Sequence, residues 1–182
     1  MSALAKDLQA LLETSTLPDL GPGPRPGTKR VAELNKSLDR ILAAKKLPAE
    51  NGQLVRALIL LWHDHLDASH VIAQDIEGSN GAFVHGIMHR REPDFGNAAY
   101  WFRRVGRHPA FAEIAVRAAS LDALKSNPKV CSALLPASGW DSLAFIHLCE
   151  QYLRSSDETQ SLLQQIQAIE TEVLLDHFSR AA

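Results

Sequence analysis

Apolar residues recur at the three- and four-residue spacing of amphipathic helices along most of this 182-residue chain. The spacing predicts helices at residues 2–14, 28–46, 52–77, 82–92, 109–125 and 141–155, one that begins after Asn97 as N-cap, and a last one after Asp157. No stretch of useful length alternates apolar and polar residues as a half-buried strand would. The pattern therefore predicts an all-α fold, an irregular bundle of about seven or eight helices.

One segment, GPGPRPG at residues 21–27, stops any helix, because proline lacks a backbone donor and glycine tolerates turn conformations. The arm before it is too short to fold alone. We therefore interpret residues 1–27 as an N-terminal helix and a Gly/Pro-rich linker within a single domain, residues 1–182. Whether this helix closes over a site as a lid is left open.

The composition excludes some classes of protein. A net charge of −2 does not favour a nucleic-acid or membrane-surface partner. The two cysteines lack metal-type CxxC spacing, and no apolar run has the length of a signal core or a membrane span. We expect a cytoplasmic protein with reduced thiols.

Most of the candidate functional side chains lie in residues 52–108. Six of the eight histidines lie between positions 63 and 108, together with five of the twelve arginines. On a helix, one narrow stripe carries His63, Asp67, His70, Gln74 and Glu77. His65 falls on the core stripe and is expected to bond to a carbonyl or water, and Asp64 is expected to be solvated or paired with an arginine.

The next helix carries His85 and His89 four residues apart, on one face. If GSNG at residues 78–81 forms a tight antiparallel turn, His89 lies level with His70. The hairpin is therefore expected to bring His70, His85 and His89 to one point. Asp67, Gln74 and Glu92 would lie nearby, with His63 about 10 Å further along.

Three histidines with an open position suit one divalent metal ion such as zinc, iron, nickel or manganese. The ion would lower the pKa of a bound water, and Asp67 or Glu92 would act as general base or orient a ligand. This pattern indicates an enzyme-like protein, a metal-dependent hydrolase.

Arginines and aromatic residues follow the histidines and suit a small anionic or phosphorylated substrate. The candidate substrate-binding residues are His63, Gln74, Arg90, Arg91, Tyr100, Arg103 and Arg104. Neutralisation of the acidic helix 60–77 is an alternative role for any one arginine. Adjacent arginines diverge by about 100° on a helix, so Arg90 and Arg91 do not easily share a ligand.

Two alternatives to a metal enzyme remain open. In one, the same residues form a metal-free ligand-binding module. In the other, the histidines form a buried polar seam of a structural or interaction protein, and the C-terminal helix supports a homodimer.

Residues 61–111, with LWHDHLDASH and HRREPD followed by YWFRRVGRHP, resemble a signature segment of a family of uncharacterised proteins, which implies no activity. The pair His63–Asp64 resembles the dyad of HD-type phosphohydrolases, although no histidine precedes it as in that family. The ligand set is similar to that of DinB-like four-helix proteins, whose ligands lie on non-adjacent helices.

Overall fold

The computed structural model describes residues 3–44 and 47–180, and within them it contains eleven α-helices, one 3-10 helix and no strand. The predicted all-α class is confirmed. The first half of the chain forms α1 (Ala3–Gln9), the 3-10 turn η1 (Ala10–Leu12), α2 (Val31–Ala43), α3 (Ala49–Trp62), α4 (Leu66–Ala73) and α5 (Gly78–Arg91). The second half forms α6 (Phe95–Val105), α7 (Ala110–Ala119), α8 (Asp122–Lys125), α9 (Pro128–Leu134), α10 (Ser142–Tyr152) and α11 (Glu158–Phe178).

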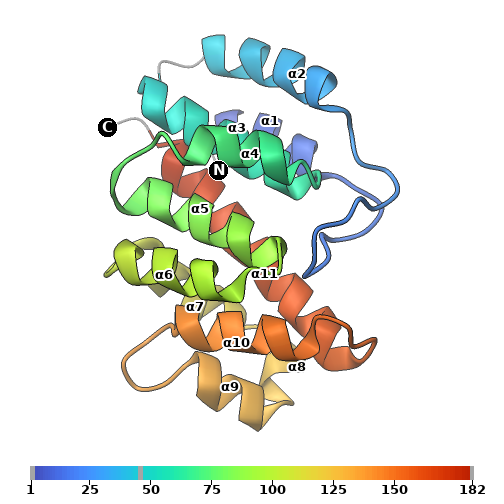
Figure 1. Cartoon of the computed structure of the whole chain (residues 1–182), viewed down its shortest axis with the longest axis vertical. Helices are drawn as coiled ribbons and strands as arrows, with labels where there is room; N and C mark the ends of the chain where they lie inside the picture. The colour runs from blue at the N-terminus through green and yellow to red at the C-terminus, as the bar shows by residue number, and fades with distance from the viewer. Residues whose placement is uncertain (1–2, 45–46, 181–182) are drawn as a thin grey trace.

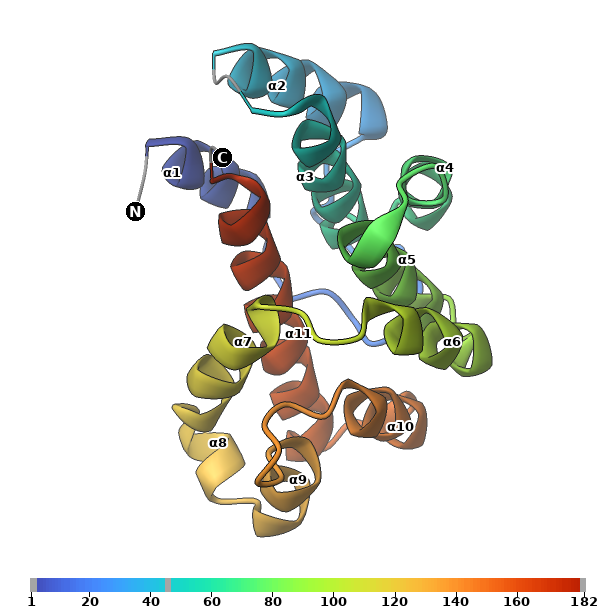
Figure 2. The same ribbon diagram turned by 90° about the vertical axis from the view of Figure 1, so that its left-hand side faces the viewer.

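Helix α11 runs along the long axis of the molecule and packs against α3, α7 and α10, whereas α2 packs on α3, and α4 on α3 and α5 (Figures 1 and 2). The C-terminal half of α11 joins the core cluster of α3, α5 and α6, while its N-terminal half joins a second cluster with α8, α9 and α10. α11 thus uses its apolar side chains inside the molecule, whereas a dimer through this helix would need them outside. In the described part of the chain, no helix has the length and apolarity to cross a membrane.

The predicted helix 52–77 is wrong as a single element, because the chain turns at residues 63–65. Asp64 adopts a left-handed backbone conformation with φ of 64°. The N–H of His65 donates to the carbonyl of Leu60, and the N–H of Asp64 donates to that of Leu61. These are the two bonds of a Schellman C-cap, with an aspartate where glycine is usual.

Several other predicted boundaries are also wrong. GSNG is the first turn of α5, and the reversal of the chain lies at residues 74–77. Asp94 caps α6, with its carboxylate accepting from the N–H of Asn97, so Asn97 itself is not the cap. The predicted helix 109–125 divides into α7 and α8, and Asn127 caps α9, which had not been predicted. The cap at Asp157 is confirmed, since its carboxylate accepts from the N–H of Gln160.

Candidate metal centre

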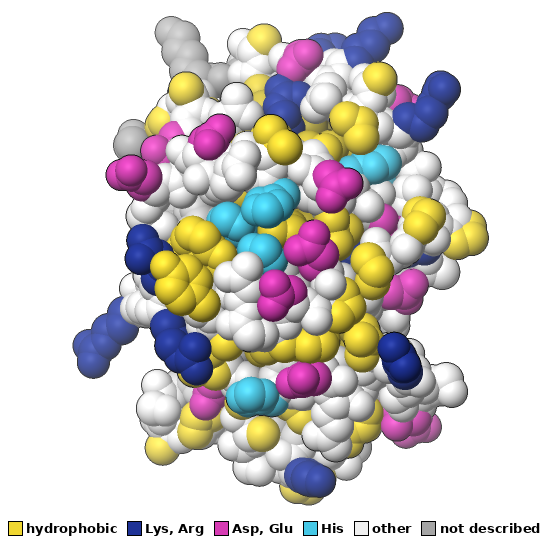
Figure 3. Space-filling view, in the orientation of Figure 1, with side chains coloured by type: hydrophobic (Ala, Val, Ile, Leu, Met, Phe, Trp, Pro, Cys, Tyr) yellow, Lys and Arg dark blue, Asp and Glu magenta, His cyan; other side chains and the backbone are white. Residues whose placement is uncertain are grey.

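The three histidines predicted to converge do so where α4 lies beside α5. His70 comes from α4, and His85 and His89 lie one turn apart on α5. One nitrogen from each ring lies within 4.8 Å of the other two. The rings of His85 and His89 stack with centroids 4.9 Å apart, and the ring of His70 is 4.8 Å from that of His85. Figure 3 shows histidine side chains grouped on this face, with acidic and apolar groups around them.

Helix α6 supports the cluster from the other side of α5. Gly86 allows this close approach, because a Cβ there would lie 2.7 Å from the ring of Phe102. At the neighbouring residue of each helix, Trp101 stacks on His85 with ring centroids 4.0 Å apart. The indole therefore fixes the plane of His85, so that its imidazole is held in place before any ligand binds.

Two of the three imidazoles, those of His85 and His89, have surroundings that favour the uncharged form. Burial, followed by the neighbouring rings of His89 and His70, lowers the pKa of His85 to about 4. Burial also lowers the pKa of His89. A neutral imidazole offers a lone pair on one nitrogen, which is the form that binds a metal ion.

The hydrogen bonds of the cluster are incomplete. Nδ1 of His85 is buried and has no hydrogen-bond partner among the described residues. Nδ1 of His89 lies 3.2 Å from a carboxylate oxygen of Glu92, and the amide nitrogen of Asn97 lies 3.1 Å from its Nε2. A buried polar atom without a partner costs free energy, so a seam that served stability alone would be expected to satisfy it.

The spacing of the nitrogens is close to that of a metal site. Ligand nitrogens of a tetrahedral zinc site lie about 3.3 Å apart, from zinc–nitrogen distances of about 2.0 Å. The separations of up to 4.8 Å must therefore shrink by about 1.5 Å. His70 is half-buried and forms no side-chain hydrogen bond within the described residues, so no such bond holds its ring in the present rotamer.

Two hollows flank the cluster. One is lined by Gln74, Glu77, Trp101 and Arg104, and we call it the arginine hollow. The guanidinium of Arg104 lies 5.5 Å from the ring of Trp101. Tyr100 is half-exposed and packs edge-on against Trp101, outside this lining.

The other hollow places the two predicted catalytic carboxylates together. Asp67 and Glu92 both line it, opposite Pro22 and Pro24 of the N-terminal segment. Glu92 contacts His89 as well, so its carboxylate lies between this hollow and the imidazole cluster. Asp67 is exposed and lies three residues before His70 on α4.

His63 lies away from the cluster. It is fully buried, its Nδ1 accepts from the N–H of Lys29, and its Nε2 lies 2.8 Å from the carbonyl of Leu11. Nε2 of His65 bonds to the carbonyl of Lys29, as the expected carbonyl-bonded histidine. Both rings therefore hold the N-terminal strap, which we define as residues 13–30.

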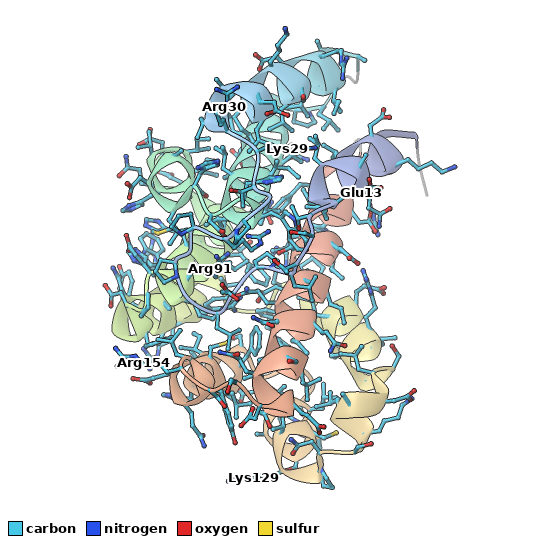
Figure 4. The ribbon with its side chains drawn as sticks, turned by 90° about the vertical axis from the view of Figure 1, so that its right-hand side faces the viewer. Glu13, Lys29, Arg30, Arg91, Lys129 and Arg154 are labelled. Atoms are coloured by element: carbon cyan, nitrogen blue, oxygen red, sulfur yellow. The ribbon has the colours of Figure 1, made fainter. Side chains whose placement is uncertain are left out.

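Arg91 and Asp64 also hold this strap. The carboxylate of Asp64 accepts from Arg25 at 2.6 Å and from Arg91 at 2.7 Å, and all three side chains are almost completely buried. Figure 4 shows the strap crossing this side of the molecule from Glu13 to Arg30, with Arg91 beside it. Of the two roles expected for Asp64, pairing with arginine is the one found, and its partners include an arginine predicted to bind substrate.

The other predicted substrate-binding arginines divide between two environments. Arg90 is completely buried, pairs with Glu170 of α11 and lies 4.4 Å from the ring of Phe145. Its guanidinium is thus engaged in the core. Arg103 and Arg104 are exposed on different sides of α6, and only Arg104 lines a hollow beside the histidines.

Two residues of the site were not predicted as such. Trp101 stacks on His85, and Asn97 contacts His89, although the sequence suggested only a helix cap for Asn97. They lie four residues apart, so both face α5 from one side of α6. This four-residue spacing could have indicated from the sequence that Asn97 and Trp101 face the histidines, because His85 and His89 on the preceding helix have the same separation.

Searches with this chain match no protein-family model, no curated protein and no solved structure. The resemblance of residues 61–111 to a family segment stays a prediction. The local geometry alone therefore carries any assignment of function.

Proposed function

We propose that this protein binds one divalent transition-metal ion through His70, His85 and His89 and uses it to hydrolyse a small anionic substrate. The observation that carries the proposal is the buried, unpartnered Nδ1 of His85 within a group of three close imidazoles. A bound ion would occupy the lone pair of this nitrogen. It would also join α4 and α5, two helices that pack against each other across a short reversal of the chain.

The residues around the cluster suit the chemistry of a catalytic metal. Three imidazole ligands leave one position of a tetrahedral ion for water, whose pKa the ion lowers toward neutrality. Glu92 is placed to accept the Nδ1 proton of His89, which leaves the lone pair on Nε2, and an ion bound there would replace the contact of Nε2 with the amide of Asn97. Zinc, iron, nickel and manganese all accept imidazole nitrogen, and the ligand set alone favours none of them.

The anionic substrate is supported by Arg104. Its side chain is exposed, lines the arginine hollow and has no ion-pair partner among the described residues. Trp101 connects this hollow to the histidines, because it contacts Arg104 on one side and His85 on another. A phosphate or carboxylate bound by the guanidinium would thus lie next to the metal position.

Metal analysis of protein purified without a histidine tag tests the proposal. We expect one equivalent of zinc, iron, nickel or manganese after loading, and its loss in His70→Ala. His147→Ala is the matched control, since this exposed histidine on α10 lies outside the cluster and pairs with Glu150. A wild-type protein that takes up none of the four ions stoichiometrically would refute the metal centre.

Activity is tested separately, with metal-loaded protein and a panel of phosphate and carboxylate esters. We expect hydrolysis that is lost in His70→Ala and that has a raised KM in Arg104→Gln. Metal binding with no hydrolysis of any ester would leave a metal-binding protein and overturn the enzymatic part.

A further inference from the structure

A third hollow, which also carries unpaired cationic groups, lies on the opposite side of α6 from the arginine hollow. We call it the α6–α10 groove, and its lining includes Arg103, Arg107, Phe111, Trp140 and Asp141. It runs between α6 and α7 on one side and the loop into α10 on the other. Figure 1 shows these elements together in the lower half of the molecule, and Figure 3 shows basic side chains along the adjoining left-hand edge.

The charges of this groove are not balanced by the protein. Arg103 and Arg107 are both exposed, and neither forms an ion pair or a side-chain hydrogen bond within the described residues. The carboxylate of Asp141 is already engaged, because it accepts from the N–H groups of Leu143 and Ala144 at the start of α10. The groove therefore presents two guanidinium groups without partners and one carboxylate that already caps the start of α10.

The floor of the groove is apolar and carries one unused donor. Phe102 is buried at its base, and Phe111 and Leu143 contribute partly exposed side chains. The indole nitrogen of Trp140 is buried and has no acceptor among the described residues. A buried indole N–H usually finds an acceptor, and a ligand bound against Trp140 in this groove would supply one.

We propose that the α6–α10 groove binds a small organic carboxylate with an apolar, preferably aromatic, body. A carboxylate accepts two parallel bonds from a guanidinium and can accept one from the indole. The apolar body would cover the exposed parts of Phe111 and Leu143. A single negative charge fits better than two, because Asp141 lines the same groove and repels added charge. The site does not depend on the proposed metal centre.

Benzoate is a suitable probe, followed by the indole N–H signal of Trp140 in two-dimensional NMR spectra of the metal-free full chain. We expect a saturable shift with a Kd of about 1 mM, the range for a ligand of about ten heavy atoms. Arg103→Gln and Arg107→Gln should each raise the Kd about tenfold. Both side chains are exposed, so the fold should be retained.

Three controls separate this site from the rest of the molecule. Arg104→Gln, on the other side of α6, and His70→Ala should leave the Kd for benzoate unchanged. Benzamide, which has the same ring without the charge, should bind at least tenfold more weakly. The proposal is overturned if the Trp140 signal does not shift, if Arg103→Gln/Arg107→Gln binds as tightly as wild type, or if benzamide or phenyl phosphate binds better than benzoate.

Discussion

Replacement of Asp64 by asparagine should destabilise the protein strongly, although this residue is not one of the proposed metal ligands. Its carboxylate is 1% exposed and accepts from Arg25, Arg91 and the backbone N–H of Arg25. Asparagine tolerates the left-handed conformation of this residue, so the substitution removes the charge and keeps the backbone turn. What remains is two buried guanidinium groups without their counter-charge.

Breaking a buried ion pair from one side costs about 3–5 kcal/mol. With a urea dependence of about 2 kcal/mol per molar, the midpoint of unfolding should fall by about 2 M. Because Arg25 ties the strap to this carboxylate, trypsin should also cleave Asp64→Asn faster at Lys29 or Arg30. Urea unfolding followed by circular dichroism, with limited proteolysis, measures both effects.

Asp67→Asn is the matched control, since this carboxylate is exposed three residues further along and should change the free energy of unfolding by less than about 0.5 kcal/mol. If Asp64→Asn costs less than about 1 kcal/mol, the two arginines do not depend on this carboxylate. The argument that a charge network fixes the strap would then be wrong.

Three further predictions concern the metal, the pH dependence and the packing of α6. Zinc at one hundred times its Kd should stabilise the protein by about 2.7 kcal/mol and raise the Tm by about 5–10 °C in thermal unfolding, and His70→Ala should abolish the rise. Burial, followed by the neighbouring His177, lowers the pKa of His108 to about 4. As the pH falls, the unfolded chain protonates this imidazole first, near pH 6.5, so the free energy of unfolding should be highest above pH 6.5 and decrease toward pH 4. His108→Asn should flatten that fall in urea titrations across this range, and an unchanged slope would contradict the assignment. Gly86→Ala should cost about 1–3 kcal/mol of unfolding free energy because its Cβ meets the ring of Phe102. Gly96→Ala should be neutral or slightly stabilising, because its Cβ would lie 3.9 Å from a carboxylate oxygen of Asp94, an ordinary contact.

The histidine cluster could be predicted because it depends on local rules. The i, i+4 spacing of His85 and His89 survives any small error in the helix boundary, and a short reversal returns α5 alongside α4. The displacement of that reversal from residues 78–81 to residues 74–77 did not separate His70 from its partners. The caps were less certain, because Asp94 and Asn97 are both good candidates for one helix start.

The turn at residues 63–65 could not be predicted from its neighbours. The apolar run before it favours a continuous helix, and an aspartate is an uncommon residue for the C′ position of a Schellman cap. The partners that make it favourable, Arg25 and Arg91, lie 39 and 27 residues away in the sequence. Arg91, which was predicted to bind substrate, is therefore buried in an ion pair with Asp64. Arg90, predicted to do the same, is buried in an ion pair with Glu170.

The turn at Asp64 also sets the rotational phase of the helix that follows. His70 is six residues beyond it, so deletion of one residue between them would rotate the imidazole by about 100° and shift it by about 1.5 Å. The strap contacts of His63 and Asp64 would stay in place while the imidazole left the cluster. The number of residues between Asp64 and His70 is therefore as strictly constrained as the identity of either. The start of α4 fixes the orientation of the histidine cluster relative to the strap.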